Sequence, residues 1–345
     1  ARVLWSEEAR RELSRRLEQD RPDVVHVHNT FPLLSASVLH ACNRAGVPVV
    51  ATVHNYKLLC ASGELFRDGR TCHDCAAGAT LPGIAHGCYR GSRLATVPVA
   101  ASMALHRSAW RTLVSAYVFI SAAQRDLMAG LGLPPERVFV KHNFVPEGPP
   151  VLATRRHRVA YLGRLDAAKG LPLLMDAWDV FRARHHASPL RLAVAGGGPL
   201  EERVRAWAGA RPDVDFLGLL DPGRAQDLLR DSLAAVVPSQ WEETFGLVAV
   251  EAMACGVVPV APARGSFPEI VRDGVDGVLF APDDPGSLAT VLAQVDQQPD
   301  HFVQLGRNAR AAHAARFAGD VSLARLLEIY EFARSRPVGA LHVGV

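Results

Sequence analysis

Short apolar runs alternate with helical segments along the whole chain, and this alternation is the feature that most constrains the fold. Val47–Val53, Ala116–Ser121 and Leu190–Ala195 have the length and content of buried strands, and segments with helical spacing lie between such runs. Strands that are apolar on both faces are typical of a parallel sheet covered by helices on both sides. With 345 residues, about two domains are expected. The sequence therefore predicts an α/β protein with two doubly wound, Rossmann-like domains that face a cleft.

A segment rich in proline and glycine, Pro146–Arg158, breaks the alternation and predicts a linker. We expect an N-terminal domain over residues 1–146, a C-terminal domain over 147–320, and a C-terminal helix and tail over 321–345 that can cross back to the N-terminal domain. The chain opens with a helix capped by Ser6, and nothing before it supplies a first strand with its glycine-rich turn. We therefore expect the N-terminal domain to lack its first strand, and the natural protein to be longer at this end.

Composition and charge exclude several classes of protein. Apolar residues make up 49% and charged residues 21% of the chain, which is typical of globular proteins. The 38 basic and 35 acidic residues give a net charge of +3, too balanced to indicate nucleic-acid binding. No apolar run is long enough to span a membrane, and no signal peptide is recognisable. A cytoplasmic location is therefore expected.

Two glutamates bracket a predicted strand-to-helix junction. Glu243 follows the apolar run Leu233–Pro238, and Glu251 lies on the helix predicted from Gly246 to Ala254. In an open α/β sheet, this edge is where ligands bind. The backbone amides near Phe245, Gly246 and Leu247, at the start of the helix, suit a phosphate. Two carboxylates beside them can hold sugar hydroxyls, so a phosphorylated sugar such as a nucleotide sugar is the expected ligand.

A second strand end carries two cations. Arg164 follows the predicted strand Val159–Leu162, and Lys169 stands five residues later at the start of a helix. Two fixed cations near a helix N-terminus can neutralise a diphosphate. Two solvated surface charges are the alternative for the pair alone, but the nearby glutamates favour phosphate binding.

Two further strand ends carry weaker signals. The turn Ala195–Pro199 holds three glycines, which allow a ligand close to the backbone or serve tight packing alone. It lacks the glycine spacing of a dinucleotide site. His54 ends the strand Val47–Val53, where it can donate to a sugar hydroxyl or move a proton; a histidine that only caps the sheet edge is the alternative. His28 and Asn29 occupy the same kind of position one strand away.

These residues together resemble glycosyltransferase family 4, the retaining enzymes of the two-domain GT-B fold. The resemblance covers nearly the whole chain, and its most specific piece is Pro238–Gly256, with Gly163–Gly170 and Asn143 also matching. It implies that Arg164 and Lys169 bind the donor diphosphate, that Glu243 contacts the donor sugar, and that Glu251 holds the ribose. It places His54 near the donor sugar and acceptor, and Leu217 near the base. The predicted catalytic residues are His54, Arg164, Lys169 and Glu243, and the predicted donor-binding residues are Asn143, Gly163, Gly197, Leu217, Phe245, Gly246, Leu247 and Glu251.

The resemblance also implies a reaction. A sugar would pass from a nucleotide-diphosphate donor to a hydroxyl of a polysaccharide, glycolipid or natural product, with retention and without a catalytic cofactor. The cations and helix amides would stabilise the leaving diphosphate. A sugar phosphorylase or nucleotide-sugar epimerase of the same fold is one alternative. A catalytically inactive binding module that lacks its first strand is another.

Four cysteines cluster in an insertion, 57–92, that is rich in glycine and has little periodicity. Two residues separate the central pair, as in tetrahedral zinc sites. A structural zinc ion is therefore predicted, with four reduced thiols or a redox-labile pair as the alternatives. Some members of the resembling family carry a similar insertion on the acceptor side. The predicted ligands are Cys60, Cys72, Cys75 and Cys88.

An apolar helical run, Leu94–Leu105, follows the insertion and is flanked by arginines. One interpretation is an amphipathic surface that approaches a lipid-linked acceptor or an anionic membrane, so that peripheral membrane contact is an expected partner. The other is a helix that lines the cleft.

Overall fold

The computed structural model describes residues 2–152 and 154–336. It divides into two compact units. Among the described residues, the first is built from 2–67, 71–142 and 323–336, and the second from 68–70, 143–152 and 154–322. Part of the predicted C-terminal tail, residues 337–345, lies outside the described residues.

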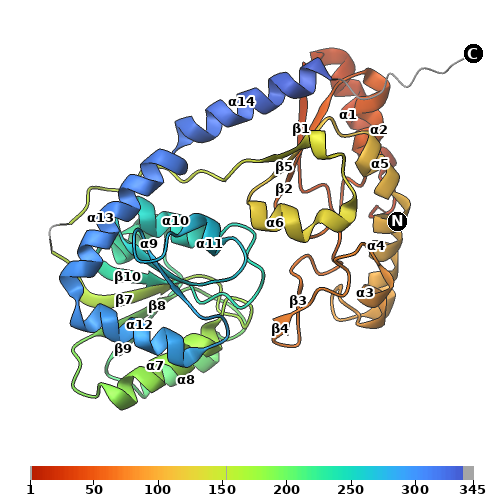
Figure 1. The fold of residues 1–345 in the computed structure, drawn as a ribbon. Coiled ribbons are helices and arrows are strands. Elements are labelled where there is room, and N and C mark those ends of the chain that lie inside the picture. The colour runs from red at the N-terminus through yellow and green to blue at the C-terminus, as the bar shows by residue number, and fades with distance from the viewer. Residues whose placement is uncertain (1, 153, 337–345) are drawn as a thin grey trace, which may run out of the picture. The chain divides into compact units, whose positions relative to one another are not determined.

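The first unit contains a sheet of four parallel strands in the order β1-β2-β5-β6 (Figure 1). Its central strands β2 and β5 are buried throughout, as the apolar runs predict. Among the described residues no strand precedes the first helix, α1. The strands are β1 Val25–His28, β2 Val49–Val53, β5 Ala116–Phe119 and β6 Val138–Val140.

The helices of the first unit begin and end where the local chemistry dictates. Ser6 accepts a hydrogen bond from the Ala9 amide and so starts α1, as predicted. Gly46, with φ of +70°, ends α2 in the left-handed conformation that glycine adopts without strain. These helices are α1 Glu7–Asp20, α2 Ser37–Ala45, α4 Arg93–Leu105, α5 Arg107–Thr112 and α6 Ala122–Leu127, with 3₁₀ turns at Ala129–Leu131 and Pro135–Arg137.

The cysteine-bearing insertion contains little regular structure: a two-stranded ribbon, β3 Phe66–Arg67 and β4 Arg70–Thr71, and a short helix, α3 Leu81–Ala85. Asp68 and Gly69 connect the ribbon, with φ angles of +52° and +78°. An Asp-Gly pair with two positive φ angles suits the tight turn of a hairpin. The weak periodicity of this segment had indicated none of these elements.

The last described helix, α14 Gly319–Ser335, contributes its second half to the first unit. Ile329 and Ala333 are buried there against Val50 and Val118 of the sheet. Tyr330 reaches His26, with 2.8 Å between the hydroxyl and the imidazole Nδ1. The C-terminal part of the described chain is therefore part of the core of the first unit.

The second unit contains a six-stranded parallel sheet in the order β12-β11-β10-β7-β8-β9. The order runs outward in both directions from the neighbours β7 and β10, which is the doubly wound pattern. Its strands are β7 Arg156–Leu162, β8 Arg191–Ala195, β9 Val214–Gly218, β10 Ser232–Val236, β11 Val258–Pro262 and β12 Val278–Phe280.

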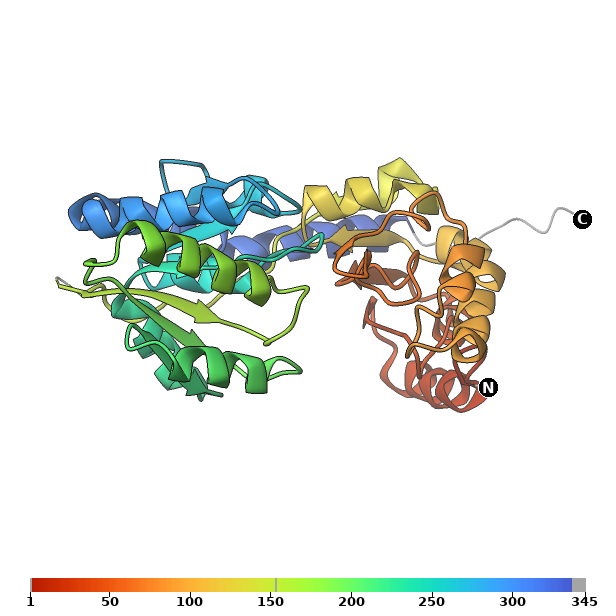
Figure 2. The ribbon, with the colours of Figure 1, turned by 90° about the horizontal axis from the view of Figure 1, so that it is seen from below.

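Helices cover both faces of this sheet (Figure 2). Large side chains such as Val159 and Tyr161 of β7 pack with α7 and α12 on one face. Small ones such as Ala160 and Ala193 pack with α9 on the other. The helices are α7 Leu171–Arg184, α8 Glu201–Gly209, α9 Pro222–Arg230, α10 Leu247–Ala254, α11 Phe267–Ile270, α12 Pro285–Gln297 and α13 Pro299–Arg316. The prediction of an α/β protein with parallel sheets in two Rossmann-like domains is confirmed.

One boundary differs from its prediction. Strand β7 begins at Arg156, so Arg156, His157 and Arg158 belong to the strand and not to the linker. The start of this strand could not be predicted from the sequence, because these residues are charged or polar and a buried parallel strand is normally an apolar run. The polar side chains are accommodated by partners at the amino end of the sheet, where Arg158 contacts Asp231.

Candidate functional site

The candidate site lies where the strand order of the second unit reverses. β7 and β10 are hydrogen-bonded neighbours, and the chain leaves them toward opposite edges of the sheet. Their carboxyl ends lie side by side, so the loops that follow them leave a crevice in which ligands of doubly wound proteins bind. The two predicted cations, Arg164 and Lys169, follow β7, and Glu243 follows β10.

The loop after β7 is shaped by an aspartate that the sequence pattern did not single out. One Asp166 carboxylate oxygen accepts a hydrogen bond from the Lys169 amide at 2.8 Å, and the other pairs with the Arg164 guanidinium. The Tyr161 hydroxyl donates to the Arg164 carbonyl at 2.8 Å. Asp166 therefore holds the side chain of Arg164 and the backbone of Lys169. Its place three residues before the Lys169 amide, as in an Asx turn, is the local signal that could have indicated this role.

Glu243 is held in a buried position after β10, with a side chain only 8% exposed. Its Oε2 accepts hydrogen bonds from Lys169 Nζ at 2.7 Å, Trp241 Nε1 at 2.9 Å and Ser239 Oγ at 3.1 Å. The Lys169 ammonium also lies 5.0 Å from the centre of the Trp241 ring. The ion pair joins the two strand-end loops directly. Ser239 and Trp241 are site residues that sequence reasoning missed, although they belong to the segment that carried the resemblance.

Helix α10 begins immediately after this loop. Gly246 takes φ of +80°, and a Cβ there would lie 2.6 Å from the Phe267 ring, so only glycine fits. Phe245 is buried and packs edge-on against Phe317, which anchors the turn. Leu247 is the first residue of α10, and its side chain is about half exposed. The first-turn amides of a helix point out of its N-terminus and carry partial positive charge, as an anion requires.

Glu251 lies on α10 with an exposed side chain. Its carboxylate makes no hydrogen bond or ion pair to residues that the structure describes. Partial desolvation by the surrounding atoms raises the pKa of this carboxyl above its ordinary value. A carboxylate that the protein does not satisfy is free to accept hydrogen bonds from ligand hydroxyls.

The glycine turn after β8 serves packing. A Cβ on Gly196 would lie 1.9 Å from the Gly163 carbonyl oxygen, and one on Gly198 would lie 2.7 Å from that of Leu165. The Gly197 carbonyl accepts from the Leu165 amide at 3.0 Å, and the Gly163 amide donates to Ala195. These contacts hold the turn against the loop that carries Arg164, which favours the tight-packing interpretation for Gly196 and Gly198. Leu217, near the end of β9, is 40% exposed.

His54 belongs to the first unit, directly after β2. Its Nε2 lies 2.7 Å from Nδ1 of His28, the last residue of the neighbouring strand β1, and the two rings stack with centroids 5.1 Å apart. Burial, then the charges of His28 and Lys141, lower the pKa of His54. His54 also lines a pocket of about 620 Å³, partly open to solvent, with Asn55, Lys57 and Trp110.

The remaining predicted residues are Asn143 and the four cysteines of the insertion. Asn143 lies in the extended segment between β6 and β7. The four cysteines form no disulfide among the described residues and line one small cavity, together with Asp74 and His86. Within residues 2–152 and 154–336, no three histidine, cysteine or acidic side chains are grouped so as to hold a metal ion.

Structural zinc therefore stays a prediction. Metal analysis of the purified protein decides it: one zinc per chain with protected thiols supports zinc, and four titratable thiols without zinc contradict it.

Two family profiles match consecutive parts of the chain. The profile described as "Glycosyl transferase 4-like domain" matches residues 2–143, and "Glycosyl transferases group 1" matches residues 149–312. The chain belongs to glycosyltransferase family 4. The boundary between the two matches falls at the connection between the two units of the structure.

Solved structures agree on the GT-B fold of this family-4 chain. Anabaena Alr3699/HepE in complex with UDP has a TM-score of 0.67 at 18% identity, covering 93% of this chain and 81% of its own. A glycosyltransferase from Rickettsia africae ESF-5 has a TM-score of 0.69 at 13% identity, covering 96% and 81%. At these identities the likeness concerns the fold alone.

Curated relatives are more similar in sequence over shorter stretches. D-inositol 3-phosphate glycosyltransferase of Thermobispora bispora is 33% identical over 63% of this chain and 56% of its own length. D-inositol 3-phosphate glycosyltransferase 2 of Catenulispora acidiphila is 36% identical over 49% and 42%. The chain thus spans about half the length of the curated relatives it matches. No helix among the described residues is long and apolar enough to cross a membrane.

Proposed function

We propose that this family-4 protein is a retaining glycosyltransferase, which moves a sugar from a nucleotide-diphosphate donor to a hydroxyl acceptor. The observation that carries the proposal is the 2.7 Å ion pair between Lys169 and Glu243. It places one cation and one carboxylate at the switch point of the sheet, beside the N-terminus of α10. A diphosphate and the sugar attached to it need these two kinds of group next to each other.

The donor is proposed to bind across these loops. Its diphosphate would contact Lys169, Arg164 and the first-turn amides of α10, and its ribose hydroxyls would donate to Glu251. Glu243 would accept from hydroxyls of the transferred sugar through Oε1, because Oε2 already accepts three hydrogen bonds. Leu217 would lie against the base. The complex of HepE with UDP makes uridine diphosphate the first nucleotide to test.

The chemistry follows from the charges. Cleavage of the sugar–phosphate bond builds negative charge on the leaving diphosphate and positive charge on the sugar. Lys169 and the helix amides are fixed before the reaction, so they stabilise the leaving group without reorganising. We propose that the acceptor attacks from the face that the diphosphate leaves, and that a diphosphate oxygen takes the proton of the acceptor hydroxyl. This route retains the anomeric configuration without a protein nucleophile.

The acceptor is proposed to bind in the pocket of the first unit that His54 lines. The lowered pKa keeps His54 neutral near pH 7, so its ring can accept or donate a hydrogen bond to a hydroxyl. A second pocket of about 610 Å³ shares Phe31, Lys57 and Trp110 with the first, so the two are adjacent. Their described lining contains no aspartate or glutamate. An acceptor without positive charge suits such a lining.

The test begins with the donor. Thermal unfolding is followed with UDP, GDP, dTDP and ADP and with several of their sugars, because a ligand that binds only the folded chain raises the melting temperature. The nucleotide sugar that shifts it is then incubated with candidate acceptors, and the anomeric configuration of the product is read by NMR. A product with retained configuration is expected.

Matched variants separate the proposal from its rivals. Lys169→Ala should abolish the nucleotide shift, whereas Arg191→Ala, which breaks the ion pair with Asp215 at the other edge of the sheet, should keep it. Cleavage that depends on phosphate would indicate a phosphorylase, and conversion of the donor without acceptor would indicate an epimerase. A folded chain that no nucleotide stabilises would contradict all three enzymes.

A further inference from the structure

The outward face of helix α4 is apolar. Leu94, Val97 and Leu105 are 85%, 46% and 71% exposed, and Ala104 is exposed between them. Their spacing of three, seven and one residues places them on one side of a helix. The opposite side is formed by Thr96, Val99 and Ala100, which are buried against the first unit. We call the exposed side, residues 94, 97, 101, 104 and 105, the α4 face.

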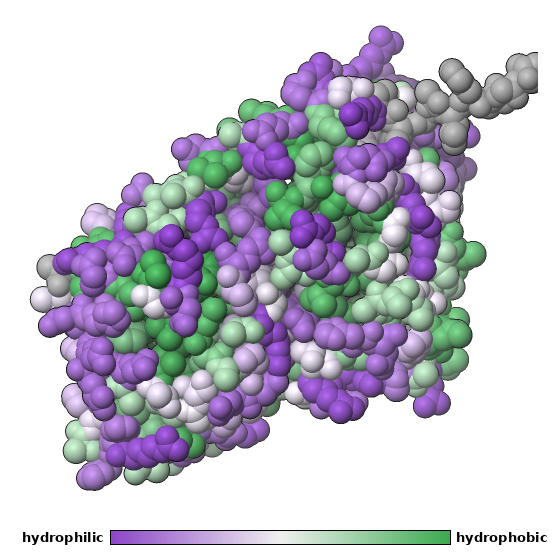
Figure 3. Space-filling model, viewed as in Figure 1, coloured by the Kyte–Doolittle hydropathy of each residue, from purple (hydrophilic) through white to green (hydrophobic). Residues whose placement is uncertain are grey.

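Such a face is unusual for a surface helix, which normally turns polar residues outward. Leu81 of α3, the helix packed against α4, is also exposed by 74%. Hydrophobic residues gather along the right-hand edge of Figure 3, the side on which Figure 1 draws α3 and α4. Scattered exposed leucines need no explanation, but a continuous apolar face marks a surface that another body covers.

Helix α14 provides a contrast within the same molecule. It exposes Leu323 and Leu327 to a similar degree, 56% and 52%. Between and beside them, however, stand the exposed charges of Arg325 and Glu328, which form an ion pair. The α4 face has no charged or polar residue among its five positions. Exposure of leucine alone therefore does not distinguish α4, whereas the absence of interspersed charge does.

The charged residues of the chain segment that contains α4 all have one sign. No aspartate or glutamate occurs from residue 75 to residue 125, whereas this stretch contains five arginines. Arg90 and Arg93 are exposed before the helix and at its first residue, and Arg111 is exposed on the next helix, α5. A cation at the first position of a helix opposes the helix dipole. Arg93 thus does not stabilise α4, and a role outside the helix explains it better.

We propose that the α4 face docks onto the surface of an anionic lipid bilayer. An apolar face on a helix of 13 residues, about 20 Å long, suits insertion into the interface in the plane of the membrane. Arginines at its ends would lie at the depth of the lipid phosphates. Acidic side chains, which the anionic surface would repel, are absent from this stretch. The proposal concerns the first unit alone and does not depend on the proposed transfer reaction.

Co-sedimentation of the whole chain with vesicles tests the docking. Vesicles that contain phosphatidylglycerol should bind the protein at low salt, and vesicles of phosphatidylcholine alone should bind it weakly. Raising the salt to 1 M shortens the screening length to about 3 Å and should release most of the protein. Arg90→Gln/Arg93→Gln should weaken binding by about fivefold for each arginine removed.

The apolar contribution has its own variant and control. Leu94→Gln/Leu105→Gln should weaken binding to anionic vesicles on the order of tenfold or more, because both side chains would insert. The matched control, Leu323→Gln/Leu327→Gln on α14, should bind as the original chain does. All four positions are exposed, so both double variants should fold, which circular dichroism checks.

Three results would overturn the proposal. The original chain could stay in the supernatant with anionic vesicles at low salt. Leu94→Gln/Leu105→Gln could bind as tightly as the original chain. Finally, sedimentation velocity could show a dimer that this variant abolishes while vesicle binding is absent, which would assign the α4 face to a second copy of the chain.

Discussion

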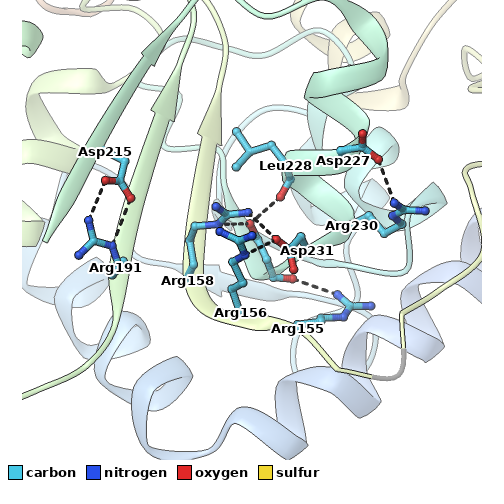
Figure 4. Close-up of polar contacts among 10 residues, drawn as sticks. Arg155, Arg156, Arg158, Arg191, Asp215, Asp227, Leu228, Arg230 and Asp231 are labelled. Atoms are coloured by element: carbon cyan, nitrogen blue, oxygen red, sulfur yellow. Dashed lines mark hydrogen bonds and ion pairs between the residues drawn. The ribbon is translucent and has the colours of Figure 1, made fainter.

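The two edges of the sheet in the second unit carry the same types of charged residue in different states. At the amino edge, Arg156 and Arg158 share the carboxylate of Asp231, at 2.8 and 3.2 Å (Figure 4). Arg155 donates to two backbone carbonyls there, those of Ser232 and Gly256. At the carboxyl edge, Lys169 and Glu243 pair across the switch point, while Glu251 makes no ion pair with a described residue.

We interpret the charged residues at the amino edge as stabilising the fold, and those at the carboxyl edge as binding a ligand. At the amino edge, the arginines bind acceptors of the protein itself. Burial lowers the pKa of Arg155 and Arg158. At the carboxyl edge, fixed cations, helix amides and an unsatisfied carboxylate lie within two neighbouring loops and the helix that follows. Substitutions at the first edge should therefore change stability, and substitutions at the second should change binding and turnover.

The largest effect is expected from Lys169→Met. We expect the rate of sugar transfer to fall by about 10²–10³-fold, because a fixed charge that stabilises the leaving group is lost. The variant also leaves Glu243 buried without its cation, which lowers the melting temperature. Lys169→Met/Glu243→Gln should recover the melting temperature but not the rate, measured with the donor that binds. Recovery of the rate as well would contradict a role for Lys169 in the reaction.

Glu251→Gln should weaken nucleotide binding by roughly tenfold, since a carboxylate accepts hydrogen bonds from hydroxyls more strongly than an amide does. The melting temperature of the free protein should stay the same or rise, because a partly desolvated carboxylate with a raised pKa is removed. Isothermal titration with the nucleotide and a thermal scan measure both. A lower melting temperature with unchanged affinity would show that Glu251 stabilises the fold and does not bind the nucleotide.

Arg158→Gln tests the amino edge. Its side chain is 13% exposed and contacts Asp231 and Ser232. We expect the free energy of unfolding to fall by about 1–3 kcal/mol, from the loss of charged hydrogen bonds. KM for the donor should not change. Urea unfolding and steady-state kinetics give the two numbers, and a raised KM without loss of stability would remove the distinction between the edges.

The smallest effect is expected in the sheet of the first unit, where His26 lies in β1. Burial, then the neighbouring His28, lowers the pKa of His26 to about 4, so the folded chain holds it neutral while the unfolded chain protonates it near 6.5. The free energy of unfolding should therefore fall as the pH drops from about 6.5 to 4. After allowance for solvent screening, His26 should contribute roughly 1 kcal/mol of this fall between pH 7 and pH 5.

His26→Asn should flatten that pH dependence, and the matched control is the exposed His301→Asn, which should leave it unchanged. Urea unfolding at several pH values compares the variants. Equal slopes for His26→Asn and the original chain would show that His26 does not titrate as its buried position requires.

The sequence predicted the loops of the site well but not the contacts inside them. Lys169 and Glu243 could be placed because each follows an apolar strand, a local pattern. Their direct pairing depends on β7 and β10 being neighbours, although the two residues stand 74 positions apart in the chain. Asp166 and Trp241 form hydrogen bonds with residues only two or three positions away, so these contacts are local. The spacing of Asp166 and the Lys169 amide is a signal that could have been used, whereas no such signal marks Trp241.

The first unit was harder to predict. His54 was found at the end of its strand, but its pairing with His28 needs the register of β1 and β2. The insertion gave no periodic signal, because its hairpin and helix are too short to repeat a pattern. The apolar run at Leu94–Leu105 predicted a helix correctly, whereas which side of it is buried depends on packing that no local pattern contains.

The most direct test of the central claim is titration calorimetry with the stabilising nucleotide on three proteins: the original chain, Lys169→Met/Glu243→Gln and Arg158→Gln. The distinction between the edges predicts that the carboxyl-edge variant loses nucleotide affinity by about tenfold or more, as expected when charged contacts are removed. Arg158→Gln should bind with the original affinity despite its lower stability. Equal affinity in all three proteins, or loss of affinity in Arg158→Gln alone, would contradict the assignment of the donor site to the carboxyl edge.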